Sequence, residues 1–426
     1  MTVAIFLGSL LLAMAIGIPI AYSLLLSGVA LMLHMDLFDA QTLAQNVING
    51  ADSFPLLAVP FFMLAGEIMN VGGLSKRIVD FAITLVGHKR GGLGFVAILA
   101  AVLMASLSGS AVADTAALAS LLLPMMVAAG HDRGRAGGLI ASAGIIAPVI
   151  PPSIGFVIFG VAANLSIGKL FLAGIFPGVL MGVGLAITWF FVARTEGSDP
   201  PPKASTAARF KALRNATWAL FLPVIVLFGL KFGVFTPTEA AVVAAVYALF
   251  VATVVYREMT WRQLYDVFVG SSKTTAVIMF LVAAASVSAY MITVAELPAQ
   301  MVELLKPFMG NQTLLMIAIM VLLMAIGTAM DMTPTILIMT PVLMPVVKAA
   351  GIDPIYFGVL FIMNCAIGLI TPPVGTVLNV TAGVGKMGMG EVIRGVLPFM
   401  AMQFAVMFLL VFFPSLVTVP ARWLAG

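Results

Sequence analysis

Residues Ala105-Ser-Leu-Ser-Gly-Ser-Ala-Val-Ala-Asp-Thr115 form a run of small and hydroxyl side chains that ends beside a carboxylate. Apolar sequence surrounds this run, over residues 94–104 and 116–127. Serine and glycine compete with helical hydrogen bonding and leave backbone groups open. If the surrounding sequence lies in lipid, those groups must be satisfied within the protein or face a wet cavity. We therefore predict a re-entrant helical hairpin over residues 91–129, with its turn near residues 108–110.

The composition places the rest of the chain in a membrane as well. Of the 426 residues, 62% are hydrophobic and 9% are charged, and the mean hydropathy is +1.17. Soluble domains carry about 25% charged residues. Because the apolar runs are far longer than barrel strands, the predicted fold class is an all-α polytopic protein of the lipid bilayer. The net charge of +4 fits an excess of basic residues in cytoplasmic loops better than nucleic-acid binding.

The N-terminal apolar sequence is predicted to be retained as membrane helix. Residues 2–33 have no basic residues ahead of the apolar run and no clear cleavage site, unlike a secretory signal. A break at Gly17-Ile-Pro19 predicts two short helices in place of one long helix. The single cysteine, Cys365, excludes an internal disulfide.

Two further features resemble the opening stretch or accompany it. Residues 136–163 are apolar but are interrupted by Pro148-Val-Ile-Pro-Pro-Ser153. Residues 314–347 predict a second hairpin around Gly327-Thr-Ala-Met-Asp-Met-Thr-Pro334, and residues 358–384 are broken at Thr371-Pro-Pro-Val-Gly375. Adjacent prolines remove amide donors and leave carbonyls unpaired, so each interruption predicts a discontinuous helix of the kind found at transporter sites.

The two sets of features form an internal repeat. A shift of 221 residues places Pro151-Pro152 on Pro372-Pro373 and Gly130 with Asp132 on Gly351 with Asp353. Basic residues flank the first hairpin, whereas the corresponding flanks of the second, residues 307–313 and 352–356, have none. By the positive-inside rule the two hairpins open to opposite sides of the membrane, which predicts an inverted repeat with both termini outside.

The predicted organisation has two halves and one linker. Residues 1–193 are the first repeat, residues 194–215 are a basic cytoplasmic linker, and residues 216–426 are the second repeat. Amphipathic surface helices are predicted at residues 75–85 and 296–308, and a third is predicted to start at residues 257–262, ahead of a separate span over residues 275–294.

Each half offers the oxygen atoms that a hard cation such as Na⁺ prefers, because broken helices present backbone carbonyls beside hydroxyl groups. The predicted sodium ligands are Ser108, Gly109, Ser110, Ile150 and Pro151 in the first half, and Gly327, Thr328, Gly368 and Thr371 in the second. The alternative is that the serines and glycines only allow close helix packing.

Two carboxylates and four polar side chains complete the candidate site. Asp114 and Asp331 lie at apparent membrane depth, where an ionisable group is a functional candidate. They could instead support the hairpin turns by accepting backbone N–H bonds. The side chains predicted to contact a polar substrate are Ser110, Ser153, Thr376 and Asn379; Asn379 could equally bond a neighbouring helix.

Enzyme motifs are absent from the sequence. The three histidines lie far apart in predicted loops, and no thiol pair or phosphate-binding glycine loop occurs. The sequence therefore predicts a secondary transporter and not an enzyme or an ATP-driven pump.

Four motifs carry a resemblance to a known family. They are Ser106-Leu-Ser-Gly-Ser-Ala-Val-Ala-Asp-Thr115, Gly144-Ile-Ile-Ala-Pro-Val-Ile-Pro-Pro-Ser153, Phe235-Thr-Pro-Thr-Glu-Ala240 and Gly368-Leu-Ile-Thr-Pro-Pro-Val-Gly375. Together they resemble the large membrane subunit of a tripartite ATP-independent periplasmic (TRAP) transporter, the DctM family. The resemblance extends over essentially the whole chain.

This resemblance implies an elevator-type, Na⁺-coupled importer in a bacterial inner membrane. It also implies a small four-helix membrane subunit and a periplasmic binding protein that delivers a carboxylate, such as a sugar acid, a sialic acid or a C4-dicarboxylate. The implied sodium ligands are Ser108, Ser110, Pro151, Gly327, Gly368 and Thr371. The alternatives are a stand-alone Na⁺/carboxylate symporter of the wider ion-transporter superfamily and, from another class, an intramembrane enzyme or an assembly scaffold.

Overall fold

The computed structural model describes residues 2–195 and 202–425. Over these residues the chain is entirely helical, and eight of its helices are long and apolar enough to cross a membrane. This confirms the predicted all-α polytopic class. The break at Gly17 separates α1 (Thr2–Ala15) from α2 (Ile20–His34), as predicted.

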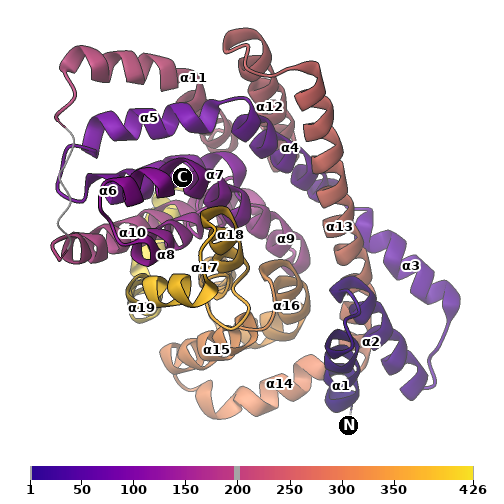
Figure 1. The fold of residues 1–426 in the computed structure, drawn as a ribbon. Coiled ribbons are helices and arrows are strands. Elements are labelled where there is room, and N and C mark those ends of the chain that lie inside the picture. Colours follow the sequence, from indigo (N-terminus) through magenta and orange to yellow (C-terminus); the bar gives the residue numbers. More distant parts are fainter. Residues whose placement is uncertain (1, 196–201, 426) are drawn as a thin grey trace.

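The described helices fall into two groups, which we call the frame and the core (Figure 1). The frame consists of α1 and α2, α3 (Ala40–Ala51), the short helix Phe54–Leu57, α4 (Ala58–Val71), α5 (Leu74–Val86), α11 (Thr206–Lys231), α12 (Pro237–Phe250) with a π-helical end at Val251–Val255, α13 (Trp261–Val294) and α14 (Leu297–Leu305) followed by the short helix Lys306–Phe308. The core consists of α6 (Gly92–Ser108), α7 (Ala111–Ala128), α8 (Arg133–Gly144), α9 (Ile154–Ala163), α10 (Ile167–Ala193), α15 (Gln312–Gly327), α16 (Met332–Ala349), α17 (Pro354–Gly368), α18 (Thr376–Gly385), α19 (Met389–Phe412) and α20 (Ser415–Ala425).

Both predicted hairpins are present as pairs of helices with tight turns. Helices α6 and α7 meet at Gly109, which is left-handed with φ of 61°, and Ser110 caps α7. Helices α15 and α16 meet at residues 328–331, and Asp331 caps α16 by accepting a hydrogen bond from the Met332 amide at 2.8 Å. We call residues 108–110 tip 1 and residues 328–331 tip 2.

Both predicted helix interruptions are also present. Residues 145–153 separate α8 from α9, and residues 369–375 separate α17 from α18. We call these segments break 1 and break 2. Each contains the adjacent prolines that the sequence places there, so the interruption occurs where two amide donors are missing.

The core is assembled from crossed contacts between the two halves of the chain. Helix α18, which follows break 2, packs on α7 of the first hairpin, and α9, which follows break 1, packs on α16 of the second hairpin. Within the frame, α4 packs on α12, while α13 packs on α2, α3 and α4. Helix α5 packs on α11 and leads directly into α6, so it joins the frame to the core.

Two boundaries differ from the sequence-based expectation. Trp261–Val294 is one continuous 34-residue helix, where a surface helix and a separate span over residues 275–294 were predicted. The reason is local: Thr260 and Gln263 form a capping box, and no proline interrupts the helix that follows. Helix α11 begins at Thr206, inside the predicted linker of residues 194–215, of which residues 196–201 lie outside the described residues.

Glycines bring α8 and α19 unusually close, and this contact gives a stability prediction. A Cβ atom on Gly395 would overlap the carbonyl group of Gly134 and would lie 2.8 Å from the Arg135 amide nitrogen. Because these are backbone atoms, they cannot move aside as a flexible side chain would. We expect Gly395→Ala to destabilise the folded protein by about 3 kcal/mol or more, the upper range for overpacking.

The matched control is Gly390→Ala on the same helix, where nothing lies within 4 Å of the added carbon. Thermal unfolding of the detergent-purified variants, followed by intrinsic fluorescence, measures the difference. Equal melting temperatures for the two variants would contradict the close α8–α19 contact.

Candidate functional site

Tip 1 lies between break 1 and the frame. A Cβ atom on Gly109 would overlap the carbonyl oxygen of Pro152 and would lie 3.0 Å from the Cα atom of Ser153. On the other side, a Cβ atom on Gly66 of α4 would lie 2.9 Å from the Cβ atom of Ser108. Only glycine allows both approaches, so tip 1 and break 1 form one unit. The contribution of Gly66 was not predicted, because an isolated glycine in an apolar run carries no distinctive signal.

A hydrogen-bond chain organises tip 1. The Ser110 amide donates to Ser108 Oγ at 3.1 Å, and Ser108 Oγ donates to Asp114 Oδ1 at 2.5 Å. Asp114 is only 1% exposed, and its Oδ2 atom has no hydrogen-bond partner among the described residues. A buried carboxylate oxygen without a partner is costly unless a cation compensates its charge. The environment of Asp114 therefore fits a cation held at tip 1.

Break 1 presents the carbonyl groups that the sequence analysis selected. No hydrogen bond from a described residue reaches the carbonyl oxygens of Ile150 or Pro151. Ser153 behaves differently, because its hydroxyl donates to the Pro148 carbonyl at 2.5 Å, accepts from the Phe156 amide at 3.2 Å and is fully buried. These bonds use Ser153 to cap α9, which favours a structural role over the predicted contact with substrate.

Tip 2 and break 2 also lie close together, and here the contact is made by two glycines, one immediately before each segment. A Cβ atom on Gly368 would lie 3.1 Å from the Gly327 carbonyl oxygen and 3.2 Å from its Cα atom, so the two backbones touch. Thr371 lies one turn beyond Gly368 and donates its hydroxyl to the Ile367 carbonyl at 2.8 Å. Thr328 donates its hydroxyl to the Ala325 carbonyl at 2.7 Å. Gly327 and Gly368 are therefore in contact, and the Thr371 amide donates to the Gly368 carbonyl at 3.0 Å; their role as sodium ligands stays a prediction.

The remaining candidates of the second half differ in their surroundings. Asp331 is exposed and caps α16, which is one of the two roles predicted for it. The side-chain amide of Asn379 donates a hydrogen bond to the Val374 carbonyl in break 2 at 2.9 Å. Asn379 therefore bonds the segment directly before its own helix and not a neighbouring helix. Thr376 Oγ1 is buried without a partner among the described residues, which leaves its hydroxyl available to a ligand.

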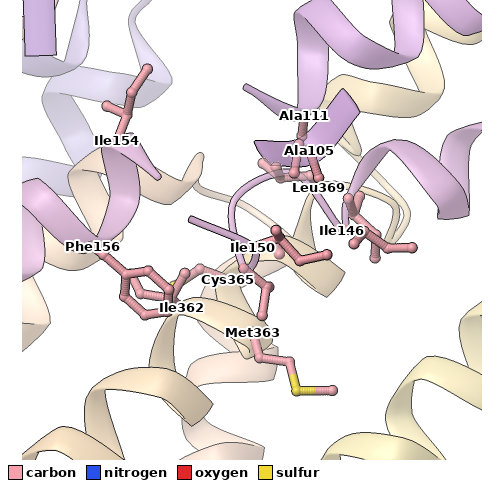
Figure 2. Close-up of a cluster of buried hydrophobic side chains, with 14 of the residues drawn as sticks. Ala105, Ala111, Ile146, Ile150, Ile154, Phe156, Ile362, Met363, Cys365 and Leu369 are labelled. Atoms are coloured by element: carbon pink, nitrogen blue, oxygen red, sulfur yellow. The ribbon is translucent and has the colours of Figure 1, made fainter. Parts of the chain in front are cut away.

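The two tip–break units meet through a buried apolar cluster. Figure 2 shows part of it, with side chains from the two arms of the first hairpin (Ala105, Ala111), from break 1 and the start of α9, and from α17 and the start of break 2 (Ile362, Met363, Cys365, Leu369). The helix that follows break 1 also contacts the helix that follows tip 2. A Cβ atom on Gly155, at the start of α9, would lie 3.3 Å from the sulfur atom of Met332, at the start of α16. The polar breaks of both halves are thus held on one shared core.

A cavity of about 680 Å³ lies between the frame and the core. Its walls come from α3 and α13 on the frame and from α9 and α16 on the core, and its polar lining includes Asn46, Asn49, Ser286 and Tyr290. Ser286 and Tyr290 of α13 were not predicted as lining residues, because residues 275–294 have the composition of an ordinary membrane span. Serine and tyrosine on an apolar helix were the available signal.

The groups that this site offers to a cation are oxygen atoms. Among residues 2–195 and 202–425, no group of three or more His, Cys, Asp or Glu side chains is placed to hold a metal ion. The tips and breaks instead offer hydroxyl groups, backbone carbonyls and one buried carboxylate. Such ligands suit a hard monovalent or divalent cation and not a soft transition metal.

Comparison with known proteins gives consistent matches over the whole chain. The sequence model described as "Tripartite ATP-independent periplasmic transporter, DctM component" matches residues 7–416. The 2,3-diketo-L-gulonate TRAP transporter large permease protein YiaN of Escherichia coli (strain K12) is 58% identical over 424 residues, which cover 100% of both chains. The sialic acid TRAP transporter large permease protein SiaM of Vibrio cholerae is 40% identical, over 94% of this chain and 93% of that protein.

Comparison with solved structures shows a similar fold. The crystal structure of the YdaH transporter of Alcanivorax borkumensis superimposes with a TM-score of 0.59, over 92% of this chain and 91% of that chain. The sequences are only 17% identical, so this likeness concerns the fold alone.

Proposed function

Because this chain belongs to the DctM family, the large permeases of TRAP transporters, we propose that it imports an organic acid by coupling it to the inward flow of sodium ions. Members of this family are transporters and not enzymes, as the sequence predicted. The observation that carries the sodium proposal is a unit that occurs twice, a hairpin turn that a glycine in or next to the turn brings against a proline-broken helix.

The sodium ligands of the proposal come from both halves. In the first half they are the tip residues Ser108, Gly109 and Ser110 and the carbonyls of Ile150 and Pro151; in the second they are Gly327, Thr328, Gly368 and Thr371. The unpartnered Oδ2 of Asp114 supplies negative charge behind tip 1. A bound sodium ion would neutralise charge there and hold each tip against its break.

The order of binding follows from electrostatics. An ionised Asp114 would repel a substrate carboxylate that approaches tip 1, because like charges in a poorly solvated site interact strongly. In the proposal sodium binds first and offsets this charge, and the acid then docks beside Ser110, Thr376 and Asn379. The relatives described above are named for diketogulonate and for sialic acid, and both substrates carry a carboxylate.

The movement of the proposal is an elevator in which the core slides against the frame. The division into frame and core, the cavity of about 680 Å³ between them, and the crossed packing of α7 on α18 and α9 on α16 support it. In this proposal the two halves are an inverted repeat with hairpins opening to opposite sides, so a movement of the core exposes one side and then the other.

The partners and location follow from the family. A TRAP large permease acts with a small membrane subunit and a periplasmic binding protein, and the inner membrane of a bacterium is the expected location. We propose that the small subunit is a separate four-helix chain that contacts the frame, and that the binding protein delivers the acid from the periplasm.

Uptake into proteoliposomes tests the function. The chain is reconstituted with its small subunit, and radiolabelled acid is supplied on the purified binding protein. We expect uptake only when sodium is higher outside than inside, and we expect Ser108→Ala combined with Thr371→Ala to shift the sodium dependence to higher sodium concentrations. Each threonine or serine ligand contributes about 1 kcal/mol or more of cation binding, so the double variant should need about tenfold or more sodium.

The controls separate the alternatives. Ser120→Ala, an exposed hydroxyl on α7 outside the tip, should leave the sodium dependence unchanged. Uptake of free acid without the binding protein would instead indicate a stand-alone symporter. Uptake that proceeds equally without a sodium gradient would contradict the coupling.

A further inference from the structure

The turn between α5 and α6 and the start of α11 form a concentrated patch of positive charge. His88 and Lys89 lie in this turn, Lys203 lies just ahead of α11, and Arg209 lies in the first turns of α11. Helices α5 and α11 pack on each other, as their neighbouring ribbons show (Figure 1). Loss of hydration lowers the pKa of the His88 imidazole, and the charges of Arg209, Lys203 and Lys89 lower it further.

Several donors of this patch have no hydrogen-bond partner in the part of the chain that the structure describes. Arg209 Nε and Nη2 are buried and have no hydrogen-bond partner among the described residues, and the same holds for His88 Nδ1. A half-buried guanidinium with two unpaired donors is unfavourable, because its lost hydration is not replaced. The fixed fork of arginine donors matches a phosphate oxygen pair. An anion of phosphate type would supply the missing acceptors.

The surroundings of the patch point to a lipid as the source of that phosphate. Helix α11 continues from Arg209 into a face of exposed apolar side chains, with Phe210 68%, Leu213 40% and Trp218 44% exposed. Basic residues beside exposed aromatic side chains are typical of a helix at the boundary between headgroups and acyl chains. Basic pockets between helices on the cytoplasmic side of a membrane bind anionic headgroups.

We propose that the α5–α6 turn and the first turns of α11 form a binding site for the phosphate headgroup of an anionic phospholipid. In this site Arg209 donates from Nε and Nη2 to the phosphate, His88 donates from Nδ1, and Lys89 and Lys203 supply charge from the rim. The bound headgroup connects the frame helix α11 to the turn through which α5 enters the core. This inference depends on the membrane placement of the chain and not on its sodium coupling.

Native mass spectrometry of the full chain, purified with its small subunit in neutral detergent, measures the binding of phosphatidylglycerol. We expect Arg209→Gln to weaken binding about fivefold or more, since each basic residue near the surface contributes about 1 kcal/mol to anionic-lipid attraction. The matched control is Arg262→Gln, which removes one exposed positive charge at the start of α13 and should leave binding unchanged. Lys203→Gln, outside any helix, tests the same site without risk to folding and should also weaken binding.

Measurements with two other ligands, phosphatidylcholine and inorganic phosphate, identify what the site binds. Phosphatidylcholine, which carries the phosphate without net charge, should bind weakly and equally to all variants. Equal weakening of phosphatidylglycerol binding by Arg209→Gln and Arg262→Gln would overturn the site, because it would indicate only diffuse attraction to a positive surface. Binding of inorganic phosphate at lower concentrations than phosphatidylglycerol, and its loss in Arg209→Gln, would overturn the lipid as the source.

Discussion

Gly109→Ala will reduce sodium-driven uptake about 100-fold, although the change adds only one methyl group. The added Cβ atom would overlap the carbonyl oxygen of Pro152 and press on the backbone of Ser153. Tip 1 must then withdraw from break 1, and the hydroxyl and carbonyl ligands can no longer surround one ion. Overpacking against backbone costs about 3 kcal/mol, which corresponds to roughly two orders of magnitude in rate or binding.

The control for this variant separates the overlap from the strain of the backbone. Gly109 has φ of 61°, and alanine in this region costs about 1–2 kcal/mol by itself. Gly233, in the turn before α12, has φ of 68° but has nothing within 4 Å of an added Cβ. Gly233→Ala therefore carries the same strain without the overlap and should retain uptake.

Uptake is measured in proteoliposomes, and size-exclusion chromatography checks that both variants are folded. Sodium titration of Gly109→Ala should show a weakened sodium dependence and not only a lower maximal rate. Full activity of this variant would mean that tip 1 need not seat on break 1 during transport.

Cysteines at Ala128 and Ala349 will react with a membrane-impermeant maleimide from opposite sides of the membrane. These residues are the last of α7 and α16, both are exposed, and they correspond to each other under the shift of 221 residues. Basic residues follow the first position, whereas residues 352–356 beyond the second have none. The positive-inside rule therefore places Ala128 in the cytoplasm and Ala349 outside.

The experiment compares intact spheroplasts with permeabilised cells. Ala349→Cys should be labelled in both, and Ala128→Cys only after permeabilisation. The native Cys365 is buried, so the unmodified chain supplies the background. Labelling of both positions from the same side would refute the inverted repeat and, with it, the elevator movement.

Local sequence determined much of the fold of this protein. Consecutive prolines and the Ser-Gly-Ser run specify backbone conformation within a few residues, so the breaks, the hairpin turns and the division of α1 from α2 could be predicted. Hydropathy alone placed the chain in a membrane. Continuity of α13 was not predicted, because polar residues in its first half resemble a surface helix.

The tertiary structure alone decided how these pieces meet. Nothing in the sequence indicates that α18 packs on α7, that Gly66 admits Ser108, or that Asp114 accepts from the Ser108 hydroxyl in place of backbone amides. The physical reason is that a helix in lipid is apolar on every side, so its pattern does not distinguish a face that contacts lipid from one that contacts protein. Which faces meet depends on shape, and here glycines permit the close approach that brings each tip to its break.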